Sequence, residues 1–251
     1  MTTVDLNSDL GESFGRYTIG RDKDVIGLVS SVNIACGMHA GDPIVLRNTV
    51  RAAAEAGIGI GAHPGYPDLQ GFGRRDMALS PDEAYCYVLY QIGAADAFCK
   101  AQGVRLNHVK PHGQLYNTAA KDPKLSQAIA QAVYDYNPDL VLFGLAGGCL
   151  IDAGTKLGLR CAQEFFADRN YTADGTLVPR SLPHAIITDE DFAAKRVVRA
   201  VKEGRIVCET GQTIPICADT ICLHGDNEKT LAFARLINQT LQEEGIEIRH
   251  P

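Results

Sequence analysis

Short apolar runs alternate with helical patterns along almost the whole chain, and this alternation restricts the fold more than any other feature. The apolar runs predict seven strands, at residues 3–7, 31–35, 57–62, 106–110, 140–144, 160–165 and 219–223. Helices are predicted between them, at residues 41–57, 80–103, 122–135, 148–157, 189–203 and 227–244. Strands and helices that alternate in one chain build parallel sheets with helical crossovers, so we expect a single α/β domain over residues 1–251.

Local signals support several of these elements. Asp42 is placed to cap the helix that Pro43 begins, and Ser80 with Glu83 forms a capping box at the start of the next helix. Residues 205–217 have the pattern of a hairpin. Seven parallel strands in a chain of 251 residues fit a closed or nearly closed β/α barrel. A doubly wound open sheet is the alternative, and periodicity alone does not separate the two.

The overall composition argues against several classes of partner. The formal net charge of -6 disfavours nucleic acid or an anionic membrane surface. No apolar run approaches the roughly 18 residues that span a bilayer, and the N-terminus shows no signal-peptide pattern. The 8 cysteines form no C-x-x-C pair, which favours buried thiols in a reducing compartment over structural zinc. We therefore expect a cytoplasmic protein, with homo-oligomerisation left open.

Polar side chains gather at the C-terminal ends of the predicted strands. Titratable groups stand at or just past the ends of six of the seven strands, with Asn7, Asn33 and Cys36 beside them. The titratable residues are Asp5, Asp9, Glu12, His39, His63, Lys110, His112, Glu164, Asp168, Arg169, His224 and Asp226. In barrels and in open α/β sheets these ends converge on one face, where ligand sites are built. The sequence therefore predicts a polar pocket at that face.

Some of these residues have simpler structural explanations. Asp226 precedes a predicted helix and suits an N-cap, and His224 would serve as a structural hydrogen-bonding group. Glu164 would form a salt bridge in the pocket wall with Arg169 or Arg180. For these residues the structural and the functional explanations both stay open.

Other residues at the strand ends favour a function. A strand-end lysine that faces inward needs an anion or a carboxylate, so Lys110 and the nearby His39 are difficult to explain as structural. His63 and His112 each stand beside proline or glycine at a strand end, which also favours a functional role. Cys36, in contrast, is better explained as a packed thiol than as a nucleophile, because nothing beside it indicates a positive environment.

Nucleotide-binding signatures are absent from the sequence. It contains no GxxxxGK[ST] phosphate loop and no GxGxxG between a strand and a helix. It also lacks the HExxH motif of many zinc proteases and the GxSxG motif of serine hydrolases. The chain therefore shows no standard nucleotide site of its own.

Six segments of the chain together resemble the LamB/YcsF family. In order, they are DLNSDLGESFG, SVNIACGMHAGDP, GAHPGYPDLQGFGRR, HVKPHGQLYN, FADRNYTADGTLVPRS and CLHGDN. They extend from residue 5 to residue 227, so the resemblance covers nearly the whole chain. Because all six motifs occur in the order in which the family carries them, the resemblance is highly specific.

The resemblance implies a fold, a reaction and partners. The implied fold is a seven-stranded β/α barrel of the glycoside hydrolase/deacetylase type. The implied reaction is the ATP-dependent opening of 5-oxo-L-proline (pyroglutamate) to L-glutamate. The implied partners are B and C subunits. ATP would bind at a site that a partner shares or supplies. Distant members of the superfamily hold a divalent metal, and the matching ligands here would be Asp9, His63 and His112, with magnesium or zinc as the ion.

A mechanism follows from these expectations. Asp9, or a metal that it holds, would activate the attacking water, and Glu12 is a further candidate catalytic group. Lys110 and His39 would stabilise the developing oxyanion or phosphate. The lactam is a poor electrophile, so phosphorylation of its oxygen would explain the need for ATP.

The remaining predictions concern substrate binding. Arg169 or Arg180 would hold the substrate carboxylate, since a planar guanidinium suits bidentate pairing. The other predicted substrate-binding residues are Asn7, Asn33, Glu164, His224 and Asp226. Two other functions stay open, namely an ATP-independent, metal-dependent amide hydrolase or deacetylase, and a non-catalytic protein that binds the substrate for its partners.

Overall fold

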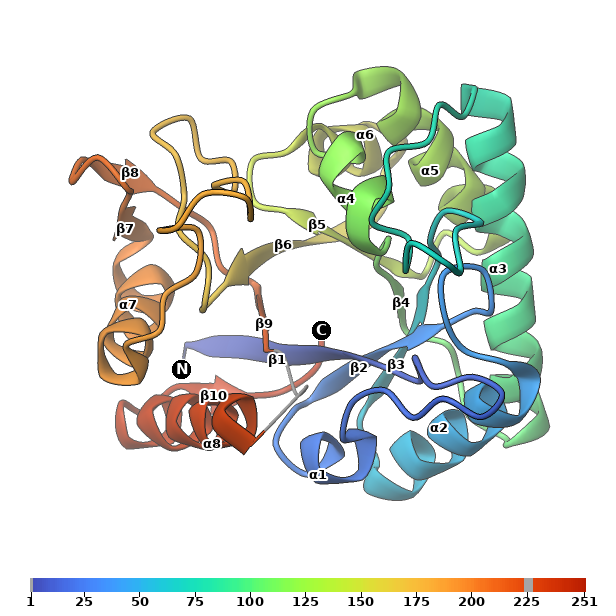
Figure 1. Ribbon diagram of the computed structural model, residues 1–251, viewed down its shortest axis with the longest axis horizontal. Coiled ribbons are helices and arrows are strands. Elements are labelled where there is room, and N and C mark those ends of the chain that lie inside the picture. The colour runs from blue at the N-terminus through green and yellow to red at the C-terminus, as the bar shows by residue number, and fades with distance from the viewer. Residues whose placement is uncertain (1, 224–227) are drawn as a thin grey trace.

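The computed structural model describes residues 2–223 and 228–251, and seven parallel strands form a closed barrel at its centre (Figure 1). In order around the barrel, the strands are β1 (Thr3–Leu10), β2 (Ser31–Ala35), β3 (Gly59–His63), β4 (His108–Val109), β5 (Val141–Leu145), β6 (Arg160–Phe166) and β9 (Thr220–Cys222). Pairing of β1 with β9 closes the ring. The predicted seven-stranded β/α barrel is confirmed, and the open-sheet alternative is wrong.

The first strand pairs with three other strands along its length. Residues 3–4 pair with β10 (Glu247–Ile248), residues 5–7 pair with β9, and residues 7–10 pair with β2. All three pairings are parallel. The strand that carries the first predicted site residues is therefore held by segments from both ends of the chain.

Helices surround the strands, as Figure 1 shows, with α2, α3, α5 and α6 along one side and α7 and α8 along the other. The helices in the described residues are α1 (Asp22–Ile26), α2 (Pro43–Ala56), α3 (Pro81–Ala101), α4 (Gly113–Ala119), α5 (Pro123–Tyr136), α6 (Cys149–Leu157), α7 (Glu190–Glu203) and α8 (Glu228–Glu243). The predicted caps are confirmed. The Asp42 carboxylate accepts the first two free N–H groups of α2, and Ser80 and Glu83 form the capping box of α3.

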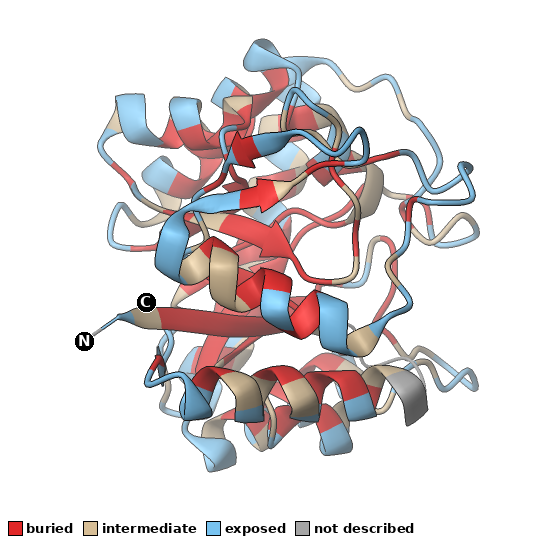
Figure 2. Ribbon diagram, turned by 90° about the vertical axis from the view of Figure 1, so that its left-hand side faces the viewer, coloured by how far each residue is buried: buried red, intermediate tan, exposed pale blue. Residues whose placement is uncertain are grey.

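The barrel strands are buried on both faces, as expected for a parallel sheet covered by helices. Every residue of β2, β3 and β5 is buried. Figure 2 shows the barrel strands mostly buried, whereas the helices alternate between buried and exposed residues. Apolar side chains fill the layer between strands and helices, and polar side chains such as Asn7, Asn33 and Glu164 are buried inside the barrel.

The structure differs from the prediction mainly in short elements. The helices α1 and α4 and the strand β10 were not predicted, because 5, 7 and 2 residues are too few to show a period. The strand β4 has 2 residues, although its ladder continues on both sides through Asn107 N–H to Ile60 O and Lys110 N–H to Ala62 O. The predicted hairpin is confirmed as β7 (Arg205–Val207) and β8 (Thr213–Pro215). In the described residues, no helix is long and apolar enough to span a membrane.

Candidate active site

The C-terminal ends of the barrel strands bring most of the predicted site residues together. Asn7 and Asp9 lie on β1, Asn33 on β2, His63 ends β3 and Glu164 lies on β6. Lys110 and His112 directly follow β4, and His39 lies in the loop between β2 and α2. His224 and Asp226 lie outside the described residues. The predicted convergence of polar side chains at one face is therefore present for the described residues.

Lys110 is the centre of a buried polar network. Its Nζ lies 2.7 Å from Glu164 Oε1 and 3.0 Å from Asp9 Oδ1, and it donates to Asn7 Oδ1 at 3.1 Å. Asn33 Nδ2 also donates to Asn7 Oδ1, at 2.7 Å, and to Asp9 Oδ1, at 2.8 Å. The lysine that was predicted to need an anion thus has two carboxylates, and Glu164 pairs with it rather than with an arginine.

This network fixes the charges of its members. Burial alone would lower the pKa of Lys110, but the Asp9 and Glu164 carboxylates raise that pKa well above its ordinary value. Burial would likewise raise the pKa of Asp9, yet His63 and Lys110 hold it well below the ordinary range. Both groups therefore stay charged at neutral pH, with an ammonium and a carboxylate side by side at the base of the pocket.

His63 and His112 each direct one ring nitrogen at the other ring. His63 Nδ1 donates to the carbonyl oxygen of Lys110 at 2.6 Å, and His112 Nε2 donates to that of Phe72 at 2.9 Å. A carbonyl oxygen only accepts, so each of these nitrogens carries a proton. The other two nitrogens, His63 Nε2 and His112 Nδ1, lie 3.0 Å apart. Two lone pairs at this distance repel unless a cation or a proton lies between them.

His39 and Glu12 complete a cluster of four metal-ligating side chains. The donor atoms of Glu12, His39, His63 and His112 all lie within 4.8 Å of one another. Glu12 Oε1 is 3.7 Å from His39 Nε2 and 3.6 Å from His112 Nδ1. Ligands about 2.0–2.1 Å from a tetrahedral zinc are about 3.3 Å apart, so these separations suit such an ion.

The surroundings of the cluster also fit a metal. Both ring nitrogens of His39 are buried without a hydrogen-bond partner among the described residues. Burial and the neighbouring histidines lower the pKa of His39 well below its ordinary value, and burial lowers that of His112 to about 3, which leaves these rings neutral and able to bind a cation. Backbone carbonyls that accept from the remote nitrogens of His63 and His112 are the usual outer partners of metal-bound histidines.

Two glycines allow the histidines to pack this closely. The rings of His39 and His112 are stacked, with centroids 3.6 Å apart and planes 2° apart. A Cβ on Gly73, whose φ is +62°, would lie 2.8 Å from both histidines. A Cβ on Gly65 would lie 2.5 Å from His39 Nδ1. The glycine-rich segment after β3 is therefore part of the site's wall rather than only a turn.

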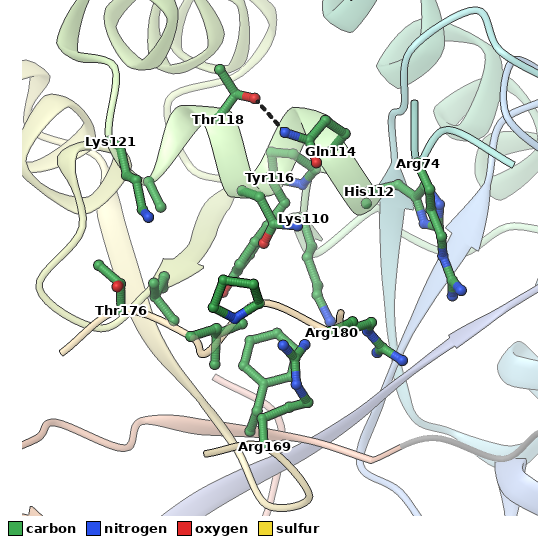
Figure 3. A pocket seen from close by; sticks show the side chains of 18 of the residues that line it. Arg74, Lys110, His112, Gln114, Tyr116, Thr118, Lys121, Arg169, Thr176 and Arg180 are labelled. Atoms are coloured by element: carbon green, nitrogen blue, oxygen red, sulfur yellow. Dashed lines mark hydrogen bonds between the residues drawn. The ribbon is translucent and has the colours of Figure 1, made fainter. Parts of the chain in front are cut away.

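A cavity of about 750 Å³ opens above these groups. Asp9, His63, Lys110 and His112 line its base. The α4 helix, the connection from α4 to α5, and residues 176–180 form the remaining walls. Figure 3 shows His112 and Arg74 on one side of the pocket, Thr176 and Lys121 on the other, and Lys110 between them. The volume lies within the range of about 300–1,000 Å³ that is typical of small-molecule sites.

The two predicted arginines both line this cavity, in different settings. Arg169 is buried, and its guanidinium donates to the carbonyl oxygens of Val178, at 2.6 Å, and Ala185, at 3.3 Å. Arg180 is exposed. Figure 3 shows Arg169 directed toward Arg180 and Lys110. Arg169 thus shapes the 176–180 wall as well as contributing charge to the pocket.

The chain is similar to known proteins over nearly its whole length. A model of the LamB/YcsF family matches residues 4–251. The chain belongs to the LamB/YcsF family. A curated relative from Geobacillus kaustophilus, named as the A subunit of 5-oxoprolinase, is 57% identical over 251 residues, covering 100% of this chain and 98% of the relative. The protein of the same name in Bacillus subtilis is 56% identical, covering 99% and 96%.

A solved structure shows the same similarity in three dimensions. The lactam utilization protein from Thermus thermophilus superposes with a TM-score of 0.93 at 46% sequence identity, covering 98% of this chain and 99% of that one. The resemblance expected from the six motifs is therefore confirmed over the whole chain.

Sequence reasoning missed several partners of the site in this LamB/YcsF protein. His108 Nε2 forms a hydrogen bond with Asn33 Oδ1 at 2.8 Å, and His108 was not among the predicted site residues. Cys222 Sγ lies 3.3 Å from Lys110 Nζ, and Thr220 Oγ1 accepts from Asn7 Nδ2 at 2.7 Å. Every second residue of β4 and β9 points into the barrel, as in any strand. This alternation in the sequence could have indicated that these side chains reach the site.

Two other expectations concern the predicted roles of Cys36 and Asp9. Burial raises the pKa of Cys36 to about 12, which agrees with a packed thiol and not a nucleophile. The predicted metal set of Asp9, His63 and His112 stays a prediction. Asp9 Oδ2 lies 3.4 Å from His63 Nε2, but the four-residue cluster contains Glu12 and not Asp9.

Proposed function

We propose that this chain is the hydrolytic component of an ATP-dependent 5-oxoprolinase, which opens the lactam of 5-oxo-L-proline to L-glutamate. Its family membership and the name of its relatives, the A subunit of 5-oxoprolinase, support the substrate. The observation that carries the hydrolytic role is the charged Lys110–Asp9 pair at the base of the cavity, beside the histidine cluster. The proposed partners are the B and C subunits.

The chemistry of the substrate explains the need for ATP. A lactam is a resonance-stabilised amide, so its carbonyl carbon resists attack by water. Phosphorylation of its oxygen makes that carbon electrophilic. Because the sequence carries no phosphate loop, the partner subunits are assigned the binding of ATP and its cleavage to ADP and phosphate.

The residues at the base of the pocket have distinct roles in this proposal. Asp9 accepts the proton of the attacking water, since its carboxylate faces the cavity and stays ionised. Lys110 stabilises the negative charge of the phosphoryl group on the oxygen of the attacked carbon. The ring C–N bond then breaks, its nitrogen takes up the proton that Asp9 accepted, and a second water releases the phosphate to leave the carboxylate of glutamate. The position of Lys110 is held by Glu164 and Asn7, at 2.7 and 3.1 Å.

The histidine cluster would hold a divalent metal through Glu12, His39, His63 and His112. When bound, such an ion supplies Lewis acidity and lowers the pKa of water. His39 is then better suited to the metal than to the oxyanion role that the sequence suggested, because its nitrogens are buried within the cluster. Asp9 lies next to this cluster, with Oδ2 3.4 Å from His63 Nε2, and so would act beside the ion.

Arg169 is assigned the substrate carboxylate. It is the buried arginine of the two, and its contacts with the Val178 and Ala185 carbonyls hold the guanidinium in place. A fixed, partly desolvated guanidinium binds a carboxylate more strongly than an exposed and mobile one does.

The experiment that tests this proposal is glutamate release from 5-oxoproline, with and without ATP, by the chain alone and with its B and C partners. We expect glutamate only when ATP and both partners are present. Lys110→Met should reduce turnover by about 10²–10³-fold, as for loss of an oxyanion donor. Lys124→Gln, on the exposed first turn of α5, is the matched control and should leave turnover unchanged.

A second candidate function is favoured by one observation, the four-residue cluster. An amide hydrolase or deacetylase that depends on metal and not on ATP would use the same ligands. It predicts hydrolysis by the isolated chain once zinc or manganese is added. Glutamate formation that needs neither ATP nor partners would replace the first proposal with this one. Absence of glutamate under every condition, with the partners folded and associated, would remove 5-oxoproline as the substrate.

A further inference from the structure

The hydrogen-bonded network around Lys110 continues below the pocket, along the inside of the barrel. Asn7 Nδ2 donates to Thr220 Oγ1 at 2.7 Å, and Thr220 Oγ1 donates to Asp5 Oδ2 at 2.5 Å. All three side chains are buried, and Asp5 pairs in register with Thr220 across β1 and β9. Asp5 does not line the cavity, so the roles assigned to the pocket residues leave this buried carboxylate unexplained.

The Asp5 carboxylate accepts from three hydroxyl groups. Ser30 Oγ and Ser31 Oγ donate to its Oδ1, each at 2.7 Å, and Thr220 donates to its Oδ2. Burial raises the pKa of Asp5, and these three donors oppose that rise by stabilising the ionised form. An ionised carboxylate only accepts, and a threonine hydroxyl has a single proton. Because Thr220 gives that proton to Asp5, it can only accept from Asn7.

The direction of this bond fixes the orientation of the Asn7 carboxamide. Its Nδ2 faces Thr220 and also donates to Glu164 Oε1, at 2.9 Å. Its Oδ1 therefore faces Lys110, and it accepts from the ammonium group at 3.1 Å. In the reversed orientation an N–H group would point at the ammonium and the carbonyl oxygen at the Glu164 carboxylate, so that both contacts would be repulsive. The Lys110–Glu164 pair thus depends on which way the Asn7 carboxamide lies.

We infer that Asp5 is a positioning residue for Lys110, because through Thr220 and Asn7 it sets the direction of the hydrogen bonds that hold the ammonium group. Asp5 acts through these two side chains rather than by contact with the substrate. Its effect on turnover rests on the proposed function, in which Lys110 stabilises the phosphoryl charge, whereas the direction of the hydrogen bonds does not. If Asp5 served only to stabilise the closed barrel, each of its three hydroxyl donors would matter in the same way.

The first variant is Asp5→Asn, which replaces the carboxylate by a group of the same shape that donates as well as accepts. The two serine hydroxyls favour the amide oxygen on their side, so the amide nitrogen would face Thr220. The Thr220 proton would then turn to Asn7 and reverse its carboxamide. We expect kcat for glutamate release, measured with ATP and both partners, to fall about 10–100-fold, as for loss of an outer-shell partner. KM for 5-oxoproline should be unchanged, because Arg169, which is assigned its carboxylate, lies outside these hydrogen bonds.

The second variant is Thr220→Val, which gives the same test if the first variant does not fold. It keeps the shape of the side chain and removes the hydroxyl, so it should lower kcat by a similar factor. Adding Asp5→Asn to it should cause little further loss, because the two residues act in one chain of hydrogen bonds. Thr220→Ser keeps the hydroxyl and should retain kcat. Ser31→Ala is the matched control, since this buried hydroxyl bonds the same carboxylate at 2.7 Å through the other oxygen, and it should lower stability without changing kcat.

A second readout does not need turnover. NMR of the isotope-labelled full chain reports on the side-chain amide of Asn7 and on the ammonium group of Lys110. We expect Asp5→Asn and Thr220→Val to shift both sets of signals, and Ser31→Ala to leave both in place. Unshifted signals in the first two variants would overturn the inference. An unchanged kcat in both of them, or equal losses of kcat in Asp5→Asn and Ser31→Ala, would do the same. If the wild-type complex releases no glutamate, the proposed function fails, and the NMR signals still decide whether Asp5 sets the direction of the network.

Discussion

The ammonium group of Lys110 lies 2.7 Å from Glu164 Oε1, and both side chains are buried inside the barrel. A buried ion pair is costly to break on one side only, because the remaining charge has neither water nor a partner. Here the lysine also contacts Asp9, so its loss leaves two carboxylates side by side. The pair is thus a structural requirement of the same network that is proposed to act on the substrate.

Replacement of this lysine should destabilise the fold. We expect Lys110→Met to lower the free energy of unfolding by about 3–5 kcal/mol, measured by urea denaturation at pH 7. The double variant Lys110→Met/Glu164→Gln should recover part of that loss, since it removes one of the orphaned charges. Lys124→Met at the surface should change stability by less than about 0.5 kcal/mol. A double variant that is as unstable as the sum of its single variants would show that the pair is not coupled.

The histidine cluster predicts stoichiometric metal binding. Dialysis against zinc or manganese, followed by elemental analysis, should find one ion per chain, and the ion should raise the melting temperature. His63→Ala and His112→Ala should each lose the ion, because each removes one of the four ligands. His184→Ala, which removes an exposed histidine, should bind the metal like the wild type. Retention of the ion by both cluster variants would place the metal elsewhere.

Gly73 provides a separate test of the stacked histidines. Its Cβ would lie 2.8 Å from His39 and His112, so Gly73→Ala should displace the stack and weaken metal binding by about 10–100-fold. Gly175→Ala is the matched control, because its φ of +81° imposes a similar backbone strain while nothing lies within 4 Å of the new methyl group. Both variants should lose stability, but only the first should lose metal affinity. Equal metal affinities for the two would contradict the packing argument.

His108 predicts a loss of stability in acid. Burial lowers its pKa to about 3 in the folded chain, whereas the unfolded value is about 6.5. Between these values the unfolded chain binds more protons, so stability falls as the pH is lowered from 7 toward 3. The contribution of this group approaches about 1.4 kcal/mol per pH unit. Denaturation of His108→Phe between pH 7 and pH 4 should show a shallower slope than the wild type, and His184→Gln should not.

The larger elements of the fold were predictable because they carry long or well-punctuated patterns. The helix α2 begins after Asp42 and ends before Gly57, which adopts a left-handed φ of +68°. The short elements were not predictable from periodicity. The helix α4 has 7 residues, and only its tertiary contacts show that Tyr116 faces the pocket.

The candidate site was predictable as a set of residues but not as a set of contacts. Strand ends in a parallel barrel converge whatever the sequence, so Asp9, His63 and Lys110 had to lie near one another. Which carboxylate reaches which histidine depends on loop conformation, and the loops after β1 and β2 place Glu12 and His39 in the cluster. No spacing rule in the sequence encodes that choice.

The closure of the barrel by β9 also has a consequence for how the chain is made. The bond from Thr220 to Asp5 joins residues 215 positions apart. At about 5–20 residues per second on the ribosome, β1 waits roughly 10 to 40 s for the strand that completes its ladder. During that time Asp5 and Asn7 have no partner from β9, although both end up buried. Closure of the barrel is therefore a late step of biosynthesis, and a nascent chain that stops before Thr220 should expose its polar interior to chaperones.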